Sequence, residues 1–239
     1  MQNRGYAQKI QGIIAGRIDR LEDNIKTTLQ VASVIGRNFL FRILRVLPGL
    51  SNDLKAYLLQ LQSLELIHEK RVFPELEYIF KNVITQEVAY HSLLLNRRKA
   101  LHGAIGTAME ETYANRLEEF YEVIAHHYSK SDHHARAFKY LTLSGDKALR
   151  NYSAWEALAF YKKALIVLEH HPNNDEQKKN KLKTLHAIMS PLMILNIPEE
   201  SLGLLEAGAK ISKALDDQKS LIRFYSNIGF FHSVKGRHL

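Results

Sequence analysis

The sequence predicts a mostly α-helical protein that contains one small β-hairpin. Apolar residues recur at helical spacing through most of the 239 residues, and the pattern changes to a period of two only within residues 66–80. Beyond this hairpin, small and large residues recur in a similar order along a series of helices. We therefore expect a small mixed domain followed by stacked helix pairs.

Three short helices are expected before the hairpin. The first spans about 21–35 and stops at Gly36, which adopts a left-handed conformation easily. Asn38 is expected to cap a second helix, and Ser51 a third whose apolar face runs over 54–64. Three helices followed by a hairpin are the order of parts in a winged-helix domain.

The hairpin is expected from two short alternating segments, 66–70 and 76–80, with Leu76, Tyr78 and Phe80 on one face. Helices over about 82–95 and 97–113 follow it. These patterns suggest a winged-helix domain over 1–95 and a helical stalk over 96–130.

From Leu117 onward the chain reads as helix pairs, and residues 131–239 are expected to form the repeat region. We expect helices over 117–129, 135–150, 154–170, 181–195, 199–215 and 219–234. A shift of 44 positions brings Leu158, Phe160, Tyr161 and Ala164 onto Leu202, Leu204, Leu205 and Gly208. The spacing of small and aromatic residues resembles tetratricopeptide repeats, although the shift is longer than their usual period of about 34 residues.

The last predicted helix carries an apolar row with no further helix to cover it. The row consists of Leu221, Phe224, Tyr225, Ile228 and Phe231. Solenoids normally close with a polar capping repeat. We therefore expect the repeat region to be incomplete at its C-terminus.

Composition excludes several classes of function. The chain has no cysteine, which removes disulfides and thiolate catalysis and suits a reducing cytoplasm. No window approaches the ~18 consecutive apolar residues of a membrane span. The formal net charge of +8 favours anionic partners, but the basic residues fall in short clusters that are typical of solvated helix faces.

Metal and nucleophile chemistry are also poorly supported. Histidine pairs occur at 126/127, 133/134 and 170/171, but adjacent histidines on a helix point ~100° apart and no H-E-x-x-H arrangement accompanies them. There is no G-x-S-x-G elbow. We expect no catalytic residues and no metal site.

Four strings carry a resemblance to a known family. They are IQGIIAGRIDRL (10–21), LQVASVIGRNF (29–39), FKNVITQEVAY (80–90) and AHHY (125–128). In this order they resemble the region that follows the ATPase module in STAND-type ATPases, which are found attached to class III adenylate/guanylate cyclases or to protein kinases. The resemblance extends over the whole chain.

The resemblance implies a regulatory role. In that family an upstream module binds ATP or ADP, the winged helix senses the nucleotide, and tetratricopeptide repeats bind an inducer or a protein partner. No segment here matches the G-x-x-x-x-G-K-[ST] phosphate cradle. We therefore expect no nucleotide cofactor in this chain itself and a non-catalytic function that depends on an upstream nucleotide-binding module.

Asn82 is the candidate nucleotide-sensing residue. Family members commonly have histidine at this position, two residues after the hairpin phenylalanine Phe80. Asparagine cannot take up charge as histidine can, but its amide can still contact a phosphate. The other interpretation is that Asn82 only caps the following helix.

The candidate partner-binding residues lie in the repeat region. They are Tyr152, Trp155, Tyr161 and Phe231, provided that they are not wholly buried.

Two other functions stay open. One is a free-standing tetratricopeptide adaptor that binds only a protein or peptide partner. The other is a winged-helix DNA-binding regulator, which the residues disfavour because the third helix offers Lys55 alone and the hairpin cations Lys70 and Arg71 lie among acidic residues. No membrane partner is expected.

Overall fold

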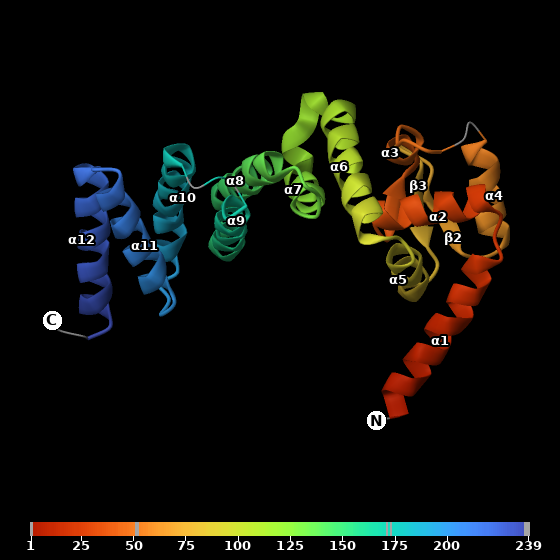
Figure 1. The fold of residues 1–239 in the computed structure, drawn as a ribbon, viewed down its shortest axis with the longest axis horizontal. Coiled ribbons are helices and arrows are strands. Elements are labelled where there is room, and N and C mark those ends of the chain that lie inside the picture. The colour runs from red at the N-terminus through yellow and green to blue at the C-terminus, as the bar shows by residue number, and fades with distance from the viewer. Residues whose placement is uncertain (1, 51–52, 171, 173, 237–239) are drawn as a thin grey trace. The chain divides into compact units, whose positions relative to one another are not determined.

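The structure is a computed structural model that describes residues 2–50, 53–170, 172 and 174–236. This part of the chain is mostly helical and contains one three-stranded antiparallel sheet (Figure 1). The chain divides into two compact units, Met1–Leu117 with Lys130–Asp132, and Glu118–Ser129 with His133–Leu239. The three-part division at 95 and 130 stays a prediction.

The first unit places helices around a central helix. Its elements are α1 (Gln2–Asp19), α2 (Asp23–Ile35), β1 (Asn38–Leu40), α3 (Phe41–Arg45), α4 (Leu54–Ser63), β2 (Ile67–Arg71), β3 (Glu77–Phe80), α5 (Val83–His91) and α6 (Leu95–Thr112). Helix α2 packs against α4, α5 and α6, and α1 packs against α5. The apolar face of α2, which includes the fully buried Leu29 and Ala32, supplies much of this core.

The sheet has the strand order β1-β3-β2, with both pairings antiparallel. The expected hairpin is present as β2 and β3, and Tyr78 and Phe80 point into the core. The Phe39 ring of β1 lies 5.6 Å, centroid to centroid, from each of these two rings. Aromatic side chains therefore join the outer strand β1 to the central strand β3.

The helix that was expected after Asn38 is wrong in its first half. Residues Asn38–Leu40 form β1, and the helical turn α3 begins only at Phe41. Pairing with β3 buries Phe39 almost completely, and this burial outweighs the local helical pattern because propensity is a weak preference. The proposed cap at Ser51 lies outside the described residues.

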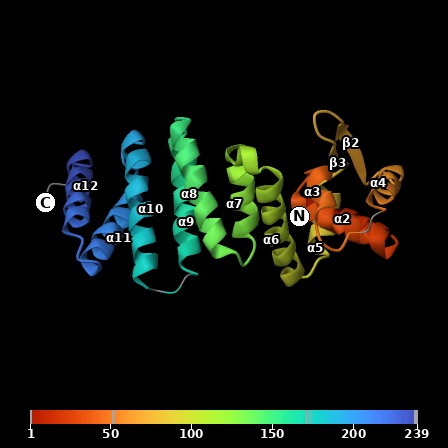
Figure 2. The ribbon, with the colours of Figure 1, turned by 90° about the horizontal axis from the view of Figure 1, so that it is seen from above.

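The second unit contains six α-helices in its described residues. They are α7 (Tyr121–Ser129), α8 (His134–Arg150), α9 (Ala154–Leu168), α10 (Asp175–Ile194), α11 (Ser201–Ala214) and α12 (Gln218–Val234), and the 3₁₀ segment η1 (Ala114–Phe120) precedes them. Each helix packs against the next, as the succession of helices in Figure 2 illustrates. Helix α10 begins six residues earlier than expected, because the Asn174 side chain caps it by accepting a hydrogen bond from the Gln177 N–H at 2.8 Å.

Two helix pairs share the same close contact. A Cβ atom on Gly145 of α8 would lie within 2.8 Å of the Tyr161 ring of α9, and one on Gly208 of α11 within 2.5 Å of the Phe224 ring of α12. In both pairs the aromatic residue follows the glycine by 16 positions (145 to 161, and 208 to 224). The pair α8/α9 therefore corresponds to α11/α12, whereas the 44-residue shift matched the second helix of one pair with the first helix of the other.

The apolar row on α12 is largely covered, contrary to expectation. Phe224 and Phe231 are fully buried in the core of the second unit, and Leu221 and Ile228 pack against that core. Of the five residues in the row only Tyr225 is exposed. The row faces α11 and the rest of the unit.

Candidate functional site

Asn82 caps helix α5. Its Oδ1 accepts a hydrogen bond from the Ile84 N–H at 2.9 Å, and its backbone is extended, as is usual at this position. The cap predicted at Asn82 is therefore present. The residue is exposed at the end of β3, and a contact with a nucleotide stays a prediction.

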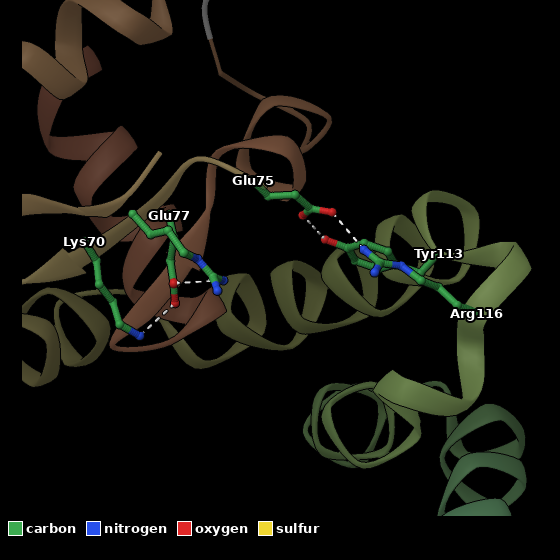
Figure 3. Close-up of polar contacts among 6 residues, drawn as sticks. Lys70, Glu75, Glu77, Tyr113 and Arg116 are labelled. Atoms are coloured by element: carbon green, nitrogen blue, oxygen red, sulfur yellow. Dashed lines mark hydrogen bonds and ion pairs between the residues drawn. The ribbon is translucent and has the colours of Figure 1, made fainter. Parts of the chain in front are cut away.

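A polar cluster fastens the hairpin to the end of α6 (Figure 3). Glu75 accepts a hydrogen bond from the Tyr113 hydroxyl at 2.9 Å and another from Arg116 at 2.8 Å. The Arg42 guanidinium lies 3.9 Å from the same carboxylate. Burial raises the pKa of Tyr113, and the hydrogen bond to Glu75 raises it further, so this phenol remains a proton donor.

The cluster borders a hollow of about 370 Å³ lined by Arg42 and residues 111–116. Two arginines would make such a hollow attractive to an anion. Here both guanidinium groups lie against Glu75, which already supplies the negative charge. The arrangement therefore holds the base of the hairpin in place.

A second carboxylate on the hairpin has a similar structural part. Glu77 is nearly buried on β3 and contacts Lys70 at 3.1 Å and Arg71 at 3.3 Å (Figure 3). Both basic side chains are therefore paired with the same carboxylate, which offsets one of their two charges. Sequence analysis did not identify the Glu75 cluster, because its partners Tyr113 and Arg116 are 38 and 41 residues away and no local pattern links them.

The four candidate partner-binding aromatics divide into two groups. Tyr152 and Trp155 are 95% and 61% exposed and are available to a partner. Tyr161 and Phe231 are fully buried, so these two side chains are not available to a partner. Tyr161 packs on Gly145 and donates a hydrogen bond to Asp146 at 2.6 Å, and Phe231 lies in the core of the second unit.

A groove in the second unit was not expected from the sequence. It has a volume of about 570 Å³ and is lined by residues of α9, α10 and α11. Its lining combines leucine and alanine side chains with lysines. The one feature of the sequence that points to this surface is the basic stretch at 178–183. The groove is therefore a candidate site in addition to those predicted from the sequence.

Within the described residues the histidine pairs make ring contacts. In the described ranges no group of three His, Asp or Glu side chains is placed to hold a metal ion. The His134 and His170 rings stack at 4.8 Å, and the His126 and His127 rings meet edge to face. His171 lies outside the described residues.

Comparison with protein-family models, with curated proteins and with solved structures finds no match to this chain. Among the described helices, none is long and apolar enough to cross a membrane.

Proposed function

We propose that this chain is the non-catalytic regulatory region of a STAND-type signal-transducing ATPase. In this proposal the first unit is a winged-helix domain that follows the state of an upstream ATP- or ADP-binding module. The second unit is a tetratricopeptide-like solenoid that binds a protein or peptide partner in the cytoplasm. The resemblance of four strings to that family is the origin of the proposal.

One observation carries the proposal: a hairpin-containing unit is followed directly by antiparallel helix pairs that repeat the same glycine-to-aromatic contact. Small residues allow helices of a repeat to approach closely, and repeated pairs create an extended surface for partners. The exposed Tyr152 and Trp155 and the groove of the second unit supply such a surface. In this proposal the exposed Asn82 makes the sensing contact.

The test begins with the coding sequence upstream of this region. If a P-loop module lies there, the protein that contains both parts is purified, and partner affinity is measured with ATP and with ADP. We expect the two affinities to differ. The variant Asn82→Ser retains a helix cap but loses the amide, so it should reduce this difference while leaving thermal stability near that of the wild type.

A free-standing adaptor gives the opposite result. No P-loop module would lie upstream, and partner affinity would be the same with either nucleotide. The groove of the second unit is the observation that keeps this second function open, because a groove of that kind binds a partner without any nucleotide.

A further inference from the structure

The groove of the second unit has an apolar floor. Leu185 of α10 is buried beneath it, and half-buried side chains of α9 and α11 form its walls, namely Leu165, Leu204, Ala207 and Ile211. The α11 side runs from Leu204 to Ala214, about 15 Å at the helical rise of 1.5 Å per residue. This length fits several consecutive residues of a partner chain.

Lysines stand at the edge of this floor. Lys178, Lys181 and Lys210 line the groove, and Glu169 is the one carboxylate among the described lining residues. Lys178 is paired with Asp175 at 3.0 Å. Within the part of the chain that the structure describes, Lys181 and Lys210 make neither a hydrogen bond nor an ion pair.

The combination selects one kind of occupant. An apolar floor favours large apolar side chains, since each one buried contributes roughly 1.5–3 kcal/mol. The unpaired ammonium groups of Lys181 and Lys210 favour carboxylates beside them and disfavour a basic chain. Neither feature alone is selective, but together they describe an acidic segment with apolar side chains.

We propose that the groove between α9, α10 and α11 is the docking site for an acidic, amphipathic segment of a protein partner. In this mode the apolar side chains of the segment cover Leu204, Ala207 and Leu185. Its carboxylates lie beside Lys181 and Lys210. The inference rests on the proposed function in one respect, that the second unit binds a protein.

The experiment selects peptides of 12 random residues from a displayed library against the full chain. We expect the selected peptides to be enriched in Asp and Glu together with Leu, Ile or Phe. Binding of these peptides is then measured by fluorescence anisotropy. The double variant Lys181→Glu/Lys210→Glu should weaken it by about tenfold or more, because it reverses two charges at the rim.

Helix α10 offers a matched control. Lys179 and Lys183 are exposed and line a different hollow, beside His186 and Asp217. Lys179→Glu/Lys183→Glu makes the same change in net charge and should alter affinity by less than about twofold. Ala207→Gln, which extends a side chain from the wall into the groove without changing charge, should weaken binding as the rim variant does.

Several results would overturn the docking site. They are an absence of selected peptides, selection of neutral or basic peptides, unchanged affinity in Lys181→Glu/Lys210→Glu, or an equal loss in the control pair. If the selected peptides lose affinity with Trp155→Ala instead, the groove is excluded while partner binding by the second unit stands. The regulatory function is tested separately, by comparing the partner affinity of the full protein with ATP and with ADP.

Discussion

At the scale of single residues, Gly208 is the position where one methyl group matters most. A Cβ atom there would lie 2.3–2.5 Å from three ring carbons of Phe224, which is itself fully buried. We expect Gly208→Ala to lower the free energy of unfolding by about 1–3 kcal/mol, because the ring has to move within a packed core. Chemical denaturation followed by circular dichroism measures this change.

Gly203 supplies the control on the same helix. A Cβ atom on it meets nothing within 4 Å. Gly203→Ala should therefore raise stability by up to about 1 kcal/mol, because alanine is the better helix former. Equal effects of the two substitutions would show that the contact between Gly208 and Phe224 has no energetic weight.

His186 is expected to make the stability of the second unit sensitive to pH. Burial lowers the pKa of its ring, and the nearby Arg223 lowers it further. The Ser220 hydroxyl uses its one proton to donate to Asp217. His186 Nε2 is therefore the donor in its 2.8 Å hydrogen bond with Ser220 Oγ. The other ring nitrogen, Nδ1, is buried without a hydrogen-bond partner. A proton on Nδ1 would have no acceptor in the folded state.

The direction of the change in stability with pH follows from the lowered pKa of His186. Above the ordinary value of about 6.5 the ring is neutral in both states and its contribution to stability is complete. As the pH falls below that value the unfolded chain takes up the proton first, so stability declines until the folded pKa is reached. NMR titration of the His186 ring checks this directly, and a pKa at or above 6.5 would contradict it. His186→Gln should reduce the fall in melting temperature between pH 7 and pH 5.

Local sequence reasoning identified the role of a residue only where its partner is near in the chain. Asn82 was assigned as a possible cap because its acceptor oxygen serves an N–H two residues away. Tyr161 and Phe231 were placed on a partner surface because periodicity shows which residues share a face but not which face is covered. The Glu75 cluster depends on tertiary folding, so no spacing rule could find it.

At the scale of elements, several helices end on a left-handed residue that is not glycine. Tyr152 after α8, Asn196 after α10 and Asp216 after α11 all have φ near +55 to +60°. After α8 and α11 the chain then turns back, with Ser153 N–H bonded to Ala148 O and Asp217 N–H bonded to Ser212 O, each at 2.9 Å. This is the hydrogen bond of a Schellman motif, in which glycine is usually preferred.

Tyr152→Gly should therefore stabilise the second unit. The Tyr152 side chain is 95% exposed, so its loss removes little packing, whereas glycine adopts a left-handed backbone without steric cost. Tyr152→Ala is the matched variant, since it also removes the ring but retains Cβ. We expect the glycine variant to be about 1 kcal/mol more stable than the alanine variant, as measured by thermal and urea unfolding. Equal stabilities would contradict the assignment of strain to this turn.

The elements that sequence patterns predicted well are those with long, regular periods. Helices α8, α9, α11 and α12 begin and end within about two residues of expectation, and the hairpin strands within about one residue. Strand β1 was missed because it is only three residues long and is defined by pairing with β3, about 40 positions later. The 63-residue correspondence of the two helix pairs was missed because only the contact between glycine and ring reveals it.

At the scale of the whole molecule, the formal net charge of +8 is distributed over both units and is partly compensated by local pairs. In the first unit, Lys70 and Arg71 contact Glu77, and Lys81 contacts Glu65 at 2.7 Å. The total charge therefore overstates the attraction of any single face for a polyanion. The sequence showed that the basic residues fall in short clusters, but it could not show which acidic residue pairs with each of them.

This distribution leads to a prediction about DNA. Helix α4, the third helix of the proposed winged helix, exposes Lys55 together with the apolar Leu59, and the exposed Leu64 follows its last residue. A groove-reading surface needs several free cations, and each phosphate that is neutralised adds nearly one unit to the slope of log K against log salt. We expect duplex DNA to bind weakly at 20 mM NaCl, with a slope of about −3 or shallower, and to be released near 150 mM.

Fluorescence anisotropy with a labelled 20-base-pair duplex across this salt range provides the measurement. Lys55→Ala should leave the slope unchanged within error. Tight binding at 150 mM NaCl that Lys55→Ala abolishes would instead support the DNA-binding alternative, because it would place α4 against the phosphates.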